Sequence, residues 1–248
     1  MDGLTTSAAS GMRARMESLE MLANNIANAT TAGFKADREF YSLYTSAEAA
    51  GAVASGNSPR AGSLPDIERQ WTDYSQGTLT PTGNSLDIAL EGRGFLTVDG
   101  PNGQLLTRSG SLKMSTNGEL QTHEGYRVRS DEGKPIRLDP TQEVVISPQG
   151  GIFQQGTMVA RLGLMESANP QALVKRGATY FQINDAASLK PATPAVHQGR
   201  LEGANFAPAE AAVRLIHVMR QFEMLQRAVT LGSEMNRKSV EDVARIGG

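Results

Sequence analysis

The residues that could carry out catalysis or hold a metal ion are few and scattered in this chain of 248 residues. It contains no cysteine, which removes disulfides, thiol catalysis and cysteine-ligated zinc sites together. The three histidines, His123, His197 and His217, lie far apart in the sequence and form no metal-binding motif. We therefore expect no metal site, no cofactor and no catalytic residue.

Other patterns that could indicate an enzyme also fail on spacing. Asp87 and Glu91 lie four positions apart in a strand-like run, which separates them by about 13 Å, whereas glycosidase carboxylates stand ~5–9.5 Å apart. We interpret them as solvated charges. Gly92-Arg93-Gly94 lacks the third glycine of a dinucleotide fingerprint, since Thr97 stands there. No serine lies in a Gly-x-Ser-x-Gly elbow, although a triad assembled from distant residues stays open.

Composition predicts a folded protein that does not bind nucleic acid. Hydrophobic residues make up 39% of the chain, and adding the 26 glycines while leaving out the 5 tyrosines gives about 48%, which is usual for a globular protein. The 24 basic and 26 acidic residues give a formal charge of −2, so no basic excess could release counterions from a phosphate backbone. No run of 18 apolar residues occurs, and Asp2 stands where a secretory signal would be basic. We expect neither membrane insertion nor a cleaved signal peptide.

The elements that must position any functional surface begin with a long amphipathic helix from Leu4 to Ile26. Its apolar positions, three or four residues apart, are Ala8, Met12, Met16, Leu19, Ala23 and Ile26. Asp2 suits the N-cap, and Gly33 can take the left-handed conformation that ends many helices. Residues 40–47 suggest a short second amphipathic stretch, and residues 49–63 are a loose tract rich in small residues that indicates a flexible connection.

From about Gln76 to Gly199 the pattern changes to short alternating runs separated by glycine-containing turns. The strand-like runs are Leu86–Leu90, Phe95–Val98, Val144–Ile146 and Tyr180–Ile183. The turns lie at residues 101–103, 116–118, 131–133 and 149–151. This spacing predicts an all-β, barrel-like middle domain.

A second long helix is predicted from Pro208 to about Ile246, where 39 residues at 1.5 Å each would span roughly 58 Å. Its apolar seam, with the three-and-four spacing of a coiled coil, comprises Leu215, Val218, Phe222, Leu225 and Val229. Ile216 and Met219 widen the apolar face beyond this seam. Glu210 lies four positions before Arg214 and should pair with it along the helix.

The predicted fold class is therefore α+β, with long N- and C-terminal helices that form a coiled-coil-like pair around an inserted all-β, barrel-like domain. The expected segments are an N-terminal helical segment (1–48), a linker (49–75), a β domain (76–199) and a C-terminal helical segment (200–248). The two apolar stripes can cover each other as an antiparallel pair, and surplus apolar width is left for another molecule.

Four blocks of sequence, in order and correctly spaced, resemble the flagellar basal-body rod and hook family of bacteria. They are Asn24–Lys35, Gly77–Phe95, Leu106–Gly110, and Gly199–Phe206 followed by Met219–Glu223. Within that family, the start of the chain and the run from Gly33 to Asp37 look most like the proximal-rod member. The distal-rod member is next, but it usually carries a Leu-Gly-Thr-Gly-Val type segment where residues 66–71 stand here.

The resemblance implies a structural subunit, not an enzyme, that self-assembles through its terminal helices into the rod across the periplasm. It implies export without a cleaved signal through the flagellar type III apparatus, with other rod proteins and copies of the chain as partners. A distal-rod or hook subunit is the alternative within the family. A module of another class, which binds glycan or processes the cell wall in the periplasm, would instead be a monomer that keeps its ligand without the helices.

The resemblance also indicates which residues form the assembly interface. The expected interface residues are Leu19, Leu22, Asn25, Ile26, Asn28, Gly33, Phe34, Leu215, Val218, Met219, Phe222, Leu225 and Val229. From the residues alone, Asn24, Asn25 and Asn28 would more often cap a helix than form amide ladders between subunits. The resemblance favours the assembly role for Asn25 and Asn28. A seam such as that of the C-terminal helix is in most proteins internal core.

Overall fold

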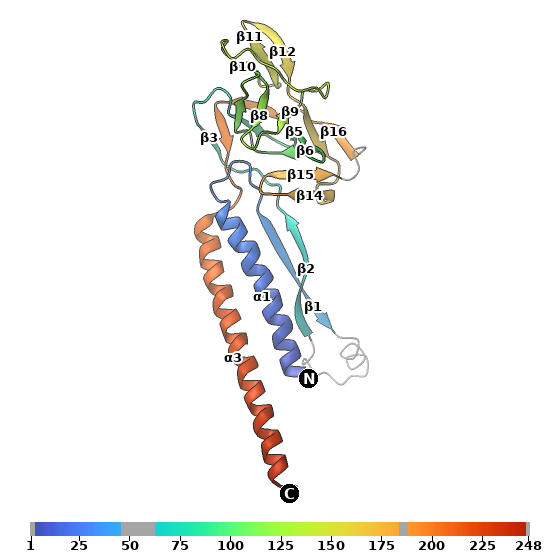
Figure 1. The fold of residues 1–248 in the computed structure, drawn as a ribbon, viewed down its shortest axis with the longest axis vertical. Coiled ribbons are helices and arrows are strands. Elements are labelled where there is room, and N and C mark those ends of the chain that lie inside the picture. Colours follow the sequence, from blue (N-terminus) through green and yellow to red (C-terminus); the bar gives the residue numbers. More distant parts are fainter. Residues whose placement is uncertain (1–2, 46–62, 184–187, 247–248) are drawn as a thin grey trace. The chain divides into compact units, whose positions relative to one another are not determined.

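The computed structural model describes residues 3–45, 63–183 and 188–246 (Figure 1). The chain divides into two compact units. The helical unit comprises Met1–Ala27, Asp37–Trp71 and Ala207–Gly248, and the β unit comprises Asn28–Ala36 and Thr72–Phe206. Both terminal segments and an internal segment thus belong to the helical unit.

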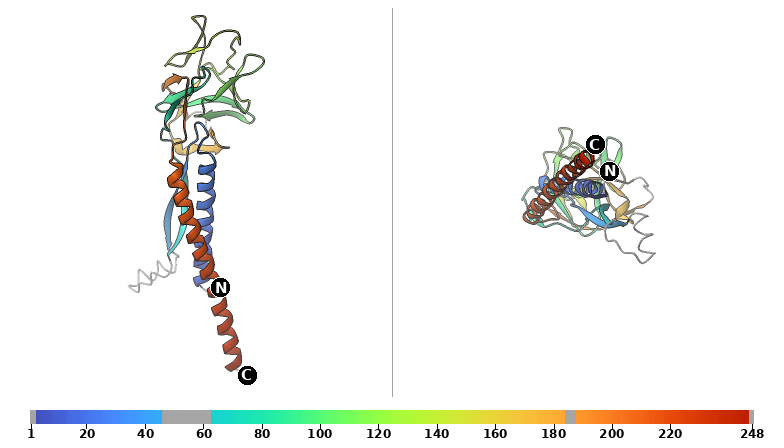
Figure 2. Two further views of the ribbon diagram at one scale, coloured as in Figure 1. Left: turned by 90° about the vertical axis from the view of Figure 1, so that its left-hand side faces the viewer. Right: turned by 90° about the horizontal axis from the view of Figure 1, so that it is seen from below.

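Two long helices build the helical unit, as the apolar spacing predicts. Helix α1 spans Gly3–Ala27 and α3 spans Pro208–Ile246, with Pro208 at its first position. The helices lie side by side and antiparallel, and α3, with 39 residues against 25, extends beyond the N-terminal end of α1 (Figures 1 and 2). The expected N-cap, Asp2, lies outside the described residues. Neither described helix carries an apolar stretch long enough to cross a bilayer.

The helical unit also contains a two-stranded sheet that the sequence pattern did not predict. Strand β1 (Asp37–Thr45) pairs with β2 (Ser63–Thr72), and β1 lies against α1. The expected short amphipathic stretch from Phe40 is therefore wrong, and part of the expected linker is strand. Aromatic and β-branched residues favour strands, and the partner strand lies too far along the chain for a local pattern to reveal it. Most of the expected flexible tract, residues 46–62, lies outside the described residues.

Gly33 has the left-handed backbone expected of it, with φ of 72°, but it does not end the first helix. That helix ends six residues earlier, at Ala27. The Gly33 amide donates to the carbonyl of Glu202 at 2.7 Å, and a Cβ on Gly33 would lie 2.3 Å from the amide nitrogen of Ser109. Only glycine fits this close approach, which belongs to the β unit.

The β unit holds sixteen strands and one short helix among its described residues, including every strand-like run that the sequence predicts. They are β3 (Leu79–Pro81), β4 (Ile88–Glu91), β5 (Phe95–Gly100), β6 (Gly103–Thr107), β7 (Leu112–Met114), β8 (Leu120–Thr122), β9 (Arg127–Val128), β10 (Val145–Ile146), β11 (Gly151–Gln154), β12 (Thr157–Arg161), β13 (Leu164–Ser167), η1 (Pro170–Ala172), β14 (Leu173–Arg176), β15 (Tyr180–Ile183), β16 (Leu189–Pro191), β17 (Ala195–Gln198) and β18 (Arg200–Glu202).

These strands form several open sheets, so the expected barrel-like closure is wrong. The largest sheet has nine strands, seven of them in the order β14-β15-β6-β5-β9-β8-β7, with β13 pairing β5 and β16. The strands β10-β11-β12 form a separate sheet, and β17-β4 and β18-β3 form two small ones. Within the described β unit the sheet ends, β14 and β7, do not pair with each other. Alternation in sequence predicts strands, but strand order and closure depend on long-range pairing.

The core of the β unit is built from residues of several of these sheets. Its main apolar cluster includes Leu96, Val98, Val128 and Ile152, all fully buried. A second cluster gathers the rings of Phe95 and Phe181, and Tyr74 packs edge-on against both. The β unit therefore has an internal core of its own, as an independent domain requires.

Candidate functional site

The inner faces of α1 and α3 meet in an apolar cluster. Met21 and Leu22 of α1 and Val218 of α3 are buried there, with Leu19 and Leu215 packed against them. Burying such a side chain stabilises a fold by ~1.5–3 kcal/mol. The seam predicted on the C-terminal helix thus has a partner within the chain. Whether the two helices supercoil around each other as a coiled coil remains a prediction.

Gly11 allows a close approach of the two helices further along the pair. A Cβ built on Gly11 would lie 3.4 Å from Cδ1 of Leu225, which is ordinary van der Waals contact. Phe222 and Val229, on the same side of α3 as Leu225, are half-buried. A side chain much larger than alanine at Gly11 would push the helices apart.

Asn25 makes a bidentate contact with the strand that follows the first helix. Its side-chain amide nitrogen donates to the carbonyl of Asp37 at 2.9 Å, and its oxygen accepts from the Asp37 amide at 3.1 Å. Because Asn25 is buried, this pairing satisfies a polar group that would otherwise be costly to bury. Asn28 behaves differently, since its side-chain oxygen accepts from the Thr31 hydroxyl at 3.3 Å. Both amides therefore have partners within the chain.

A buried carboxylate, that of Glu39 on β1, ties three elements of the helical unit together. One oxygen accepts from the hydroxyl of Ser18 on α1 at 2.7 Å, and the other accepts from Nη2 of Arg214 on α3 at 2.6 Å. The Glu39 side chain is fully buried, whereas the Arg214 side chain is 50% exposed, so the bond to Ser18 is the more shielded of the two. Arg214 therefore reaches across to β1 and does not pair with Glu210 along the helix, as the sequence led us to expect.

Among the described residues, the outer face of α3 is exposed and carries large apolar side chains with charged side chains between them. Its large apolar side chains, each between 51% and 69% exposed, are Val213, Ile216, Met224, Leu231 and Met235, and Met219, 47% exposed, lies at its edge toward the inner seam. The sequence indicated Ile216 and Met219 as surplus apolar width, but it missed how far the face continues along the helix. Several large apolar side chains exposed on one side of a helix are typical of an interaction surface.

The expected interface residues differ in exposure. Buried are Leu22, Asn25, Gly33, Phe34 and Val218; half-buried are Leu19, Ile26, Asn28, Leu215, Phe222, Leu225 and Val229; exposed is Met219. Their role in assembly remains a prediction, because a buried side chain can hold the shape of a surface without touching the partner.

A second polar site, in the β unit, is built around the carboxylate of Glu202, and we call it the Glu202 clasp. Oε1 of Glu202 lies 2.6 Å from Nζ of Lys35, and Oε2 lies 3.0 Å from Nε of Arg108. The Gly77 amide also donates to Oε1, at 3.0 Å. All three charged side chains are at most 4% exposed. Burial lowers the pKa of the Lys35 ammonium, and the adjacent Glu202 carboxylate opposes that shift.

Arg108 also holds the glycine-rich turn between β4 and β5. Its Nη1 donates to the carbonyls of Gly92 and Gly94, and its Nη2 donates to that of Leu90. The Gly92-Arg93-Gly94 segment, whose spacing excluded a nucleotide site, therefore wraps around an arginine side chain. Its role is structural.

Phe34 packs inside the β unit beside the clasp. Its ring is fully buried and meets Phe206 edge-on, with ring centroids 6.2 Å apart. Nζ of Lys175 lies 4.3 Å from the centroid of the Phe34 ring and donates to the carbonyl of Lys35 at 2.8 Å. These contacts join the segment before β1 to the segment before α3.

The candidate chemical groups do not converge in the described part of the chain. Nε2 of His197 lies 2.6 Å from Oε2 of Glu91 at the surface. Asp87 is buried and accepts from the amide of Asn84, so it is not the solvated charge expected for it. Among the described residues, no three metal-ligating side chains gather. Asp87 and Glu91 therefore have separate structural partners.

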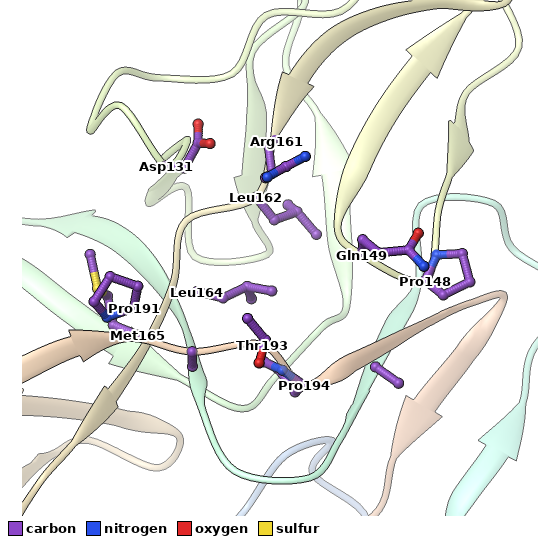
Figure 3. Close-up of a pocket in the computed structure, with 12 residues that line it drawn as sticks. Asp131, Pro148, Gln149, Arg161, Leu162, Leu164, Met165, Pro191, Thr193 and Pro194 are labelled. Carbon is purple, nitrogen blue, oxygen red and sulfur yellow. The ribbon is translucent and has the colours of Figure 1, made fainter.

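A pocket of about 640 Å³ opens in the β unit (Figure 3). Leu162 and Leu164 line it on one side, with Gln149 and Pro148 to their right and Thr193 and Pro194 below them in the view. Of the twelve described residues that line it, Asp131 alone carries a carboxylate and none is aromatic. It therefore lacks the carboxylate pair that glycan hydrolysis needs.

Comparison with known proteins gives three family matches along the chain. A model described as flagella basal body rod protein matches residues 6–35, the flagellar hook protein FlgE/F/G D1 domain matches 89–154, and the flagellar basal body rod FlgEFG protein C-terminal model matches 197–241. The flagellar basal-body rod protein FlgF of Caulobacter vibrioides is 32% identical over 231 residues, covering 92% of each chain. This chain belongs to the flagellar basal-body rod protein family.

Relatives within the rod family agree with the resemblance read from the sequence. The FlgF protein of Rhizobium meliloti is 30% identical over 87% of each chain. The FlgG protein of Bacillus subtilis is 28% identical over 94% of this chain and 96% of its own. The chain is a flagellar structural protein of the basal body and serves motility, and among the relatives compared it is more similar to FlgF than to FlgG.

Proposed function

We propose that this chain is a subunit of the flagellar rod that self-assembles through its terminal helices into the drive shaft across the periplasm. Membership of the rod family supports this role, and the similarity to FlgF proteins supports a position in the proximal rod. A distal-rod or hook subunit is the alternative within the family. Other rod proteins and further copies of the chain are its partners. The proposal includes export through the flagellar type III apparatus, without a cleaved signal peptide and without insertion into a membrane.

The uncovered outer face of α3 is the observation that carries the proposal. The inner stripe of α3 already packs against α1, so it is not free to bind another molecule without separating the pair. The outer face exposes large apolar side chains, among them Val213, Met224 and Leu231. Covering them with a neighbouring subunit would remove apolar surface from water, which is the main favourable term in protein association.

The inner and outer faces of α3 therefore have different roles in assembly. Residues of the predicted seam, such as Val218 and Leu225, hold α3 against α1 and keep the helical unit in shape. Met219 and the outer-face residues contact neighbours. Phe222, half-buried on the inner side, supports the pair and affects assembly through it.

Substitution of Leu231 with Asp tests the proposal in a bacterial strain in which the gene for the variant chain replaces the gene for the natural one. Leu231 is 59% exposed, so the substitution should leave folding and export unchanged. A charge at the centre of an apolar contact should prevent incorporation into basal bodies and abolish swimming. Incorporation is measured in isolated basal bodies, and swimming on soft agar.

Glu223→Ala is the matched control, because Glu223 is exposed and the described residues provide it with no partner. It should swim and assemble as the unmodified chain does. Complete basal bodies and normal swimming in a strain that lacks the gene altogether would show that the chain is not a required rod subunit. Normal incorporation of Leu231→Asp would move the assembly surface away from the outer face of α3.

A further inference from the structure

A second uncovered face lies on the outer side of α1. Met16 is 52% exposed there, and Ala9, Glu20 and Ala27 are exposed at spacings that place them on the same side of the helix. The carboxylate of Glu20 has no ion pair or hydrogen bond within the described part of the chain. This outer face of α1 is thus weakly apolar with one unpartnered negative charge near its middle.

The outer face of α3 has the opposite charge. Arg220 lies on the same side of α3 as Val213, Met224 and Leu231, and it is exposed. Neither Arg220 nor Arg227, one turn beyond Met224, has an ion pair or a hydrogen-bond partner among the described residues. The charges on the centre line of this face are therefore positive and available to a partner.

The two outer faces match when the helices are aligned antiparallel. The outer residues of α1, counted backwards from its C-terminal end, have the same sequence spacing as the outer residues of α3 counted forwards. The matched pairs are Ala27 with Val213, Glu20 with Arg220, Met16 with Met224, and Ala9 with Leu231. Any two helix faces share such intervals, so the chemistry at the matched positions carries the argument: opposite charges meet, large side chains meet small ones, and the two methionines meet each other.

We propose that the outer face of α1 in one copy of the chain docks on the outer face of α3 in the next copy. The inference rests on the rod function proposed above and names the surfaces that the copies use. Two like-charge pairs arise in this register, Arg13 opposite Arg227 and Glu17 opposite Glu223. Arg13 and Glu17 pair with each other, since the Glu17 carboxylate lies 3.2 Å from the Arg13 Nε, so together they present a neutralised group to the facing helix.

This contact can be repeated from one copy of the chain to the next because its two surfaces differ. A contact between different patches is heterologous, so each bound copy still offers a free α1 face on one side and a free α3 face on the other. Such a contact forms a ring or an open helical filament. The register matches the one within the chain, where Leu22 and Val218 share a cluster. Neighbouring copies would therefore be shifted little relative to each other along the helix axis.

The absence of cysteine from the chain permits a direct test by disulfide cross-linking. A chain carrying both Met16→Cys and Met224→Cys is expressed in place of the natural one, and isolated basal bodies are oxidised. The matched positions should come within disulfide distance only between copies, so non-reducing gels should show a ladder of the chain's own multiples. Met16→Cys with Met235→Cys is the control, because Met235 is 69% exposed against 61% for Met224 but lies outside the register.

Charge reversal tests the ionic part of the same contact. Glu20→Arg alone, or Arg220→Glu alone, places like charges opposite each other and should reduce the cross-linked fraction about tenfold. The two reversals combined in one chain restore opposite charges and should restore the ladder. Each variant carries the Met16→Cys and Met224→Cys pair, so the yields are compared directly.

Three outcomes would overturn the inference. They are a lack of cross-linking by the matched pair in chains that are incorporated, equal cross-linking by the control pair, and a cross-link to a protein of a different mass. In each of these cases incorporation and swimming still support the proposed rod function. Loss of the gene without any effect on basal bodies would instead contradict that function, whatever the cross-links show.

Discussion

At the scale of single residues, the Glu202 clasp brings together one residue from each of the four distant blocks of sequence that resemble the family. Each block supplies one partner, since Lys35, Gly77, Arg108 and Glu202 each come from a different block. A buried carboxylate needs both cations and the amide to offset the loss of water. The four blocks therefore meet at one buried polar site of the β unit.

The sequence could not have predicted this clasp from spacing. Lys35 and Glu202 lie 167 positions apart, and neither forms a motif with its neighbours along the chain. Glu39 was missed for the same reason, because its partners Ser18 and Arg214 come from the two ends of the chain. The blocks that carry the family resemblance were the available signal for the clasp, whereas nothing in the sequence indicates the contacts of Glu39.

Tyr180 provides a test of the polar contacts of the β unit through pH. Its hydroxyl donates to Oε2 of Glu124 at 2.5 Å and lies 3.0 Å from Oγ1 of Thr122. Burial raises the pKa of the Tyr180 phenol, and the Glu124 carboxylate adds to that shift. A raised folded-state pKa means that the contribution to stability is complete below the unfolded value of about 10 and is lost as pH rises above it.

Tyr180→Phe should therefore be less stable than the unmodified chain near neutral pH, by about 1 kcal/mol for the lost hydrogen bond. Above pH ~10 the difference in unfolding free energy should shrink by up to about 1.4 kcal/mol per pH unit, because the phenylalanine does not titrate. Urea unfolding of the full chain at several pH values measures it. A difference that stays constant through this range would show that Tyr180 ionises equally in both states.

At the scale of elements, the sequence pattern correctly predicted the features that depend on residues close together in the chain. The bounds of both long helices follow from apolar spacing, with Pro208 marking the start of α3, and the runs at Phe95 and Tyr180 are strands. Strand β1 was missed because its partner β2 begins at Ser63, so neither strand forms a hairpin with a short turn. Closure into a barrel was wrongly expected, since alternation says which residues face a core but not which edges meet.

The contact of Gly11 with Leu225 gives a test of the pairing between α1 and α3. Gly11→Ala should raise the unfolding free energy by about 0.5–1 kcal/mol, because alanine restricts the unfolded chain and its Cβ fits beside Leu225. Gly11→Leu should lower it by about 1–3 kcal/mol through overpacking. Urea unfolding followed by the helical circular dichroism signal measures both. Equal stability of the two variants would mean that the helices do not pack at this point.

At the scale of the whole molecule, the boundary of the β unit shows how the flanking segments contribute to its stability. The sequence pattern placed the β domain at residues 76–199, where the glycine-rich alternation is visible. The compact unit extends to Phe206 and includes Asn28–Ala36. These flanks are not strand-like in sequence, yet they carry Lys35 and Glu202 of the clasp and both rings of the contact between Phe34 and Phe206. A domain assigned by alternation alone therefore omits the residues that close it.

Limited proteolysis of the full chain should reveal this difference. Strand β18 pairs with β3, and Glu202 is fully buried, so the resistant core should extend past Glu202 and not end at Gly199. Glu202→Gln leaves the Lys35 and Arg108 charges buried without their anion, which costs about 3–5 kcal/mol, so cleavage should become faster and move toward Gly199. Mass spectrometry of the fragments locates the boundary.

Glu132→Gln is the control, because Glu132 pairs with Lys134 at the surface and loss of this pair should change neither the boundary nor the rate of cleavage. A core that ends at Gly199 in the unmodified chain, or a Glu202→Gln chain cleaved like the control, would show that the clasp does not hold the end of the β unit closed.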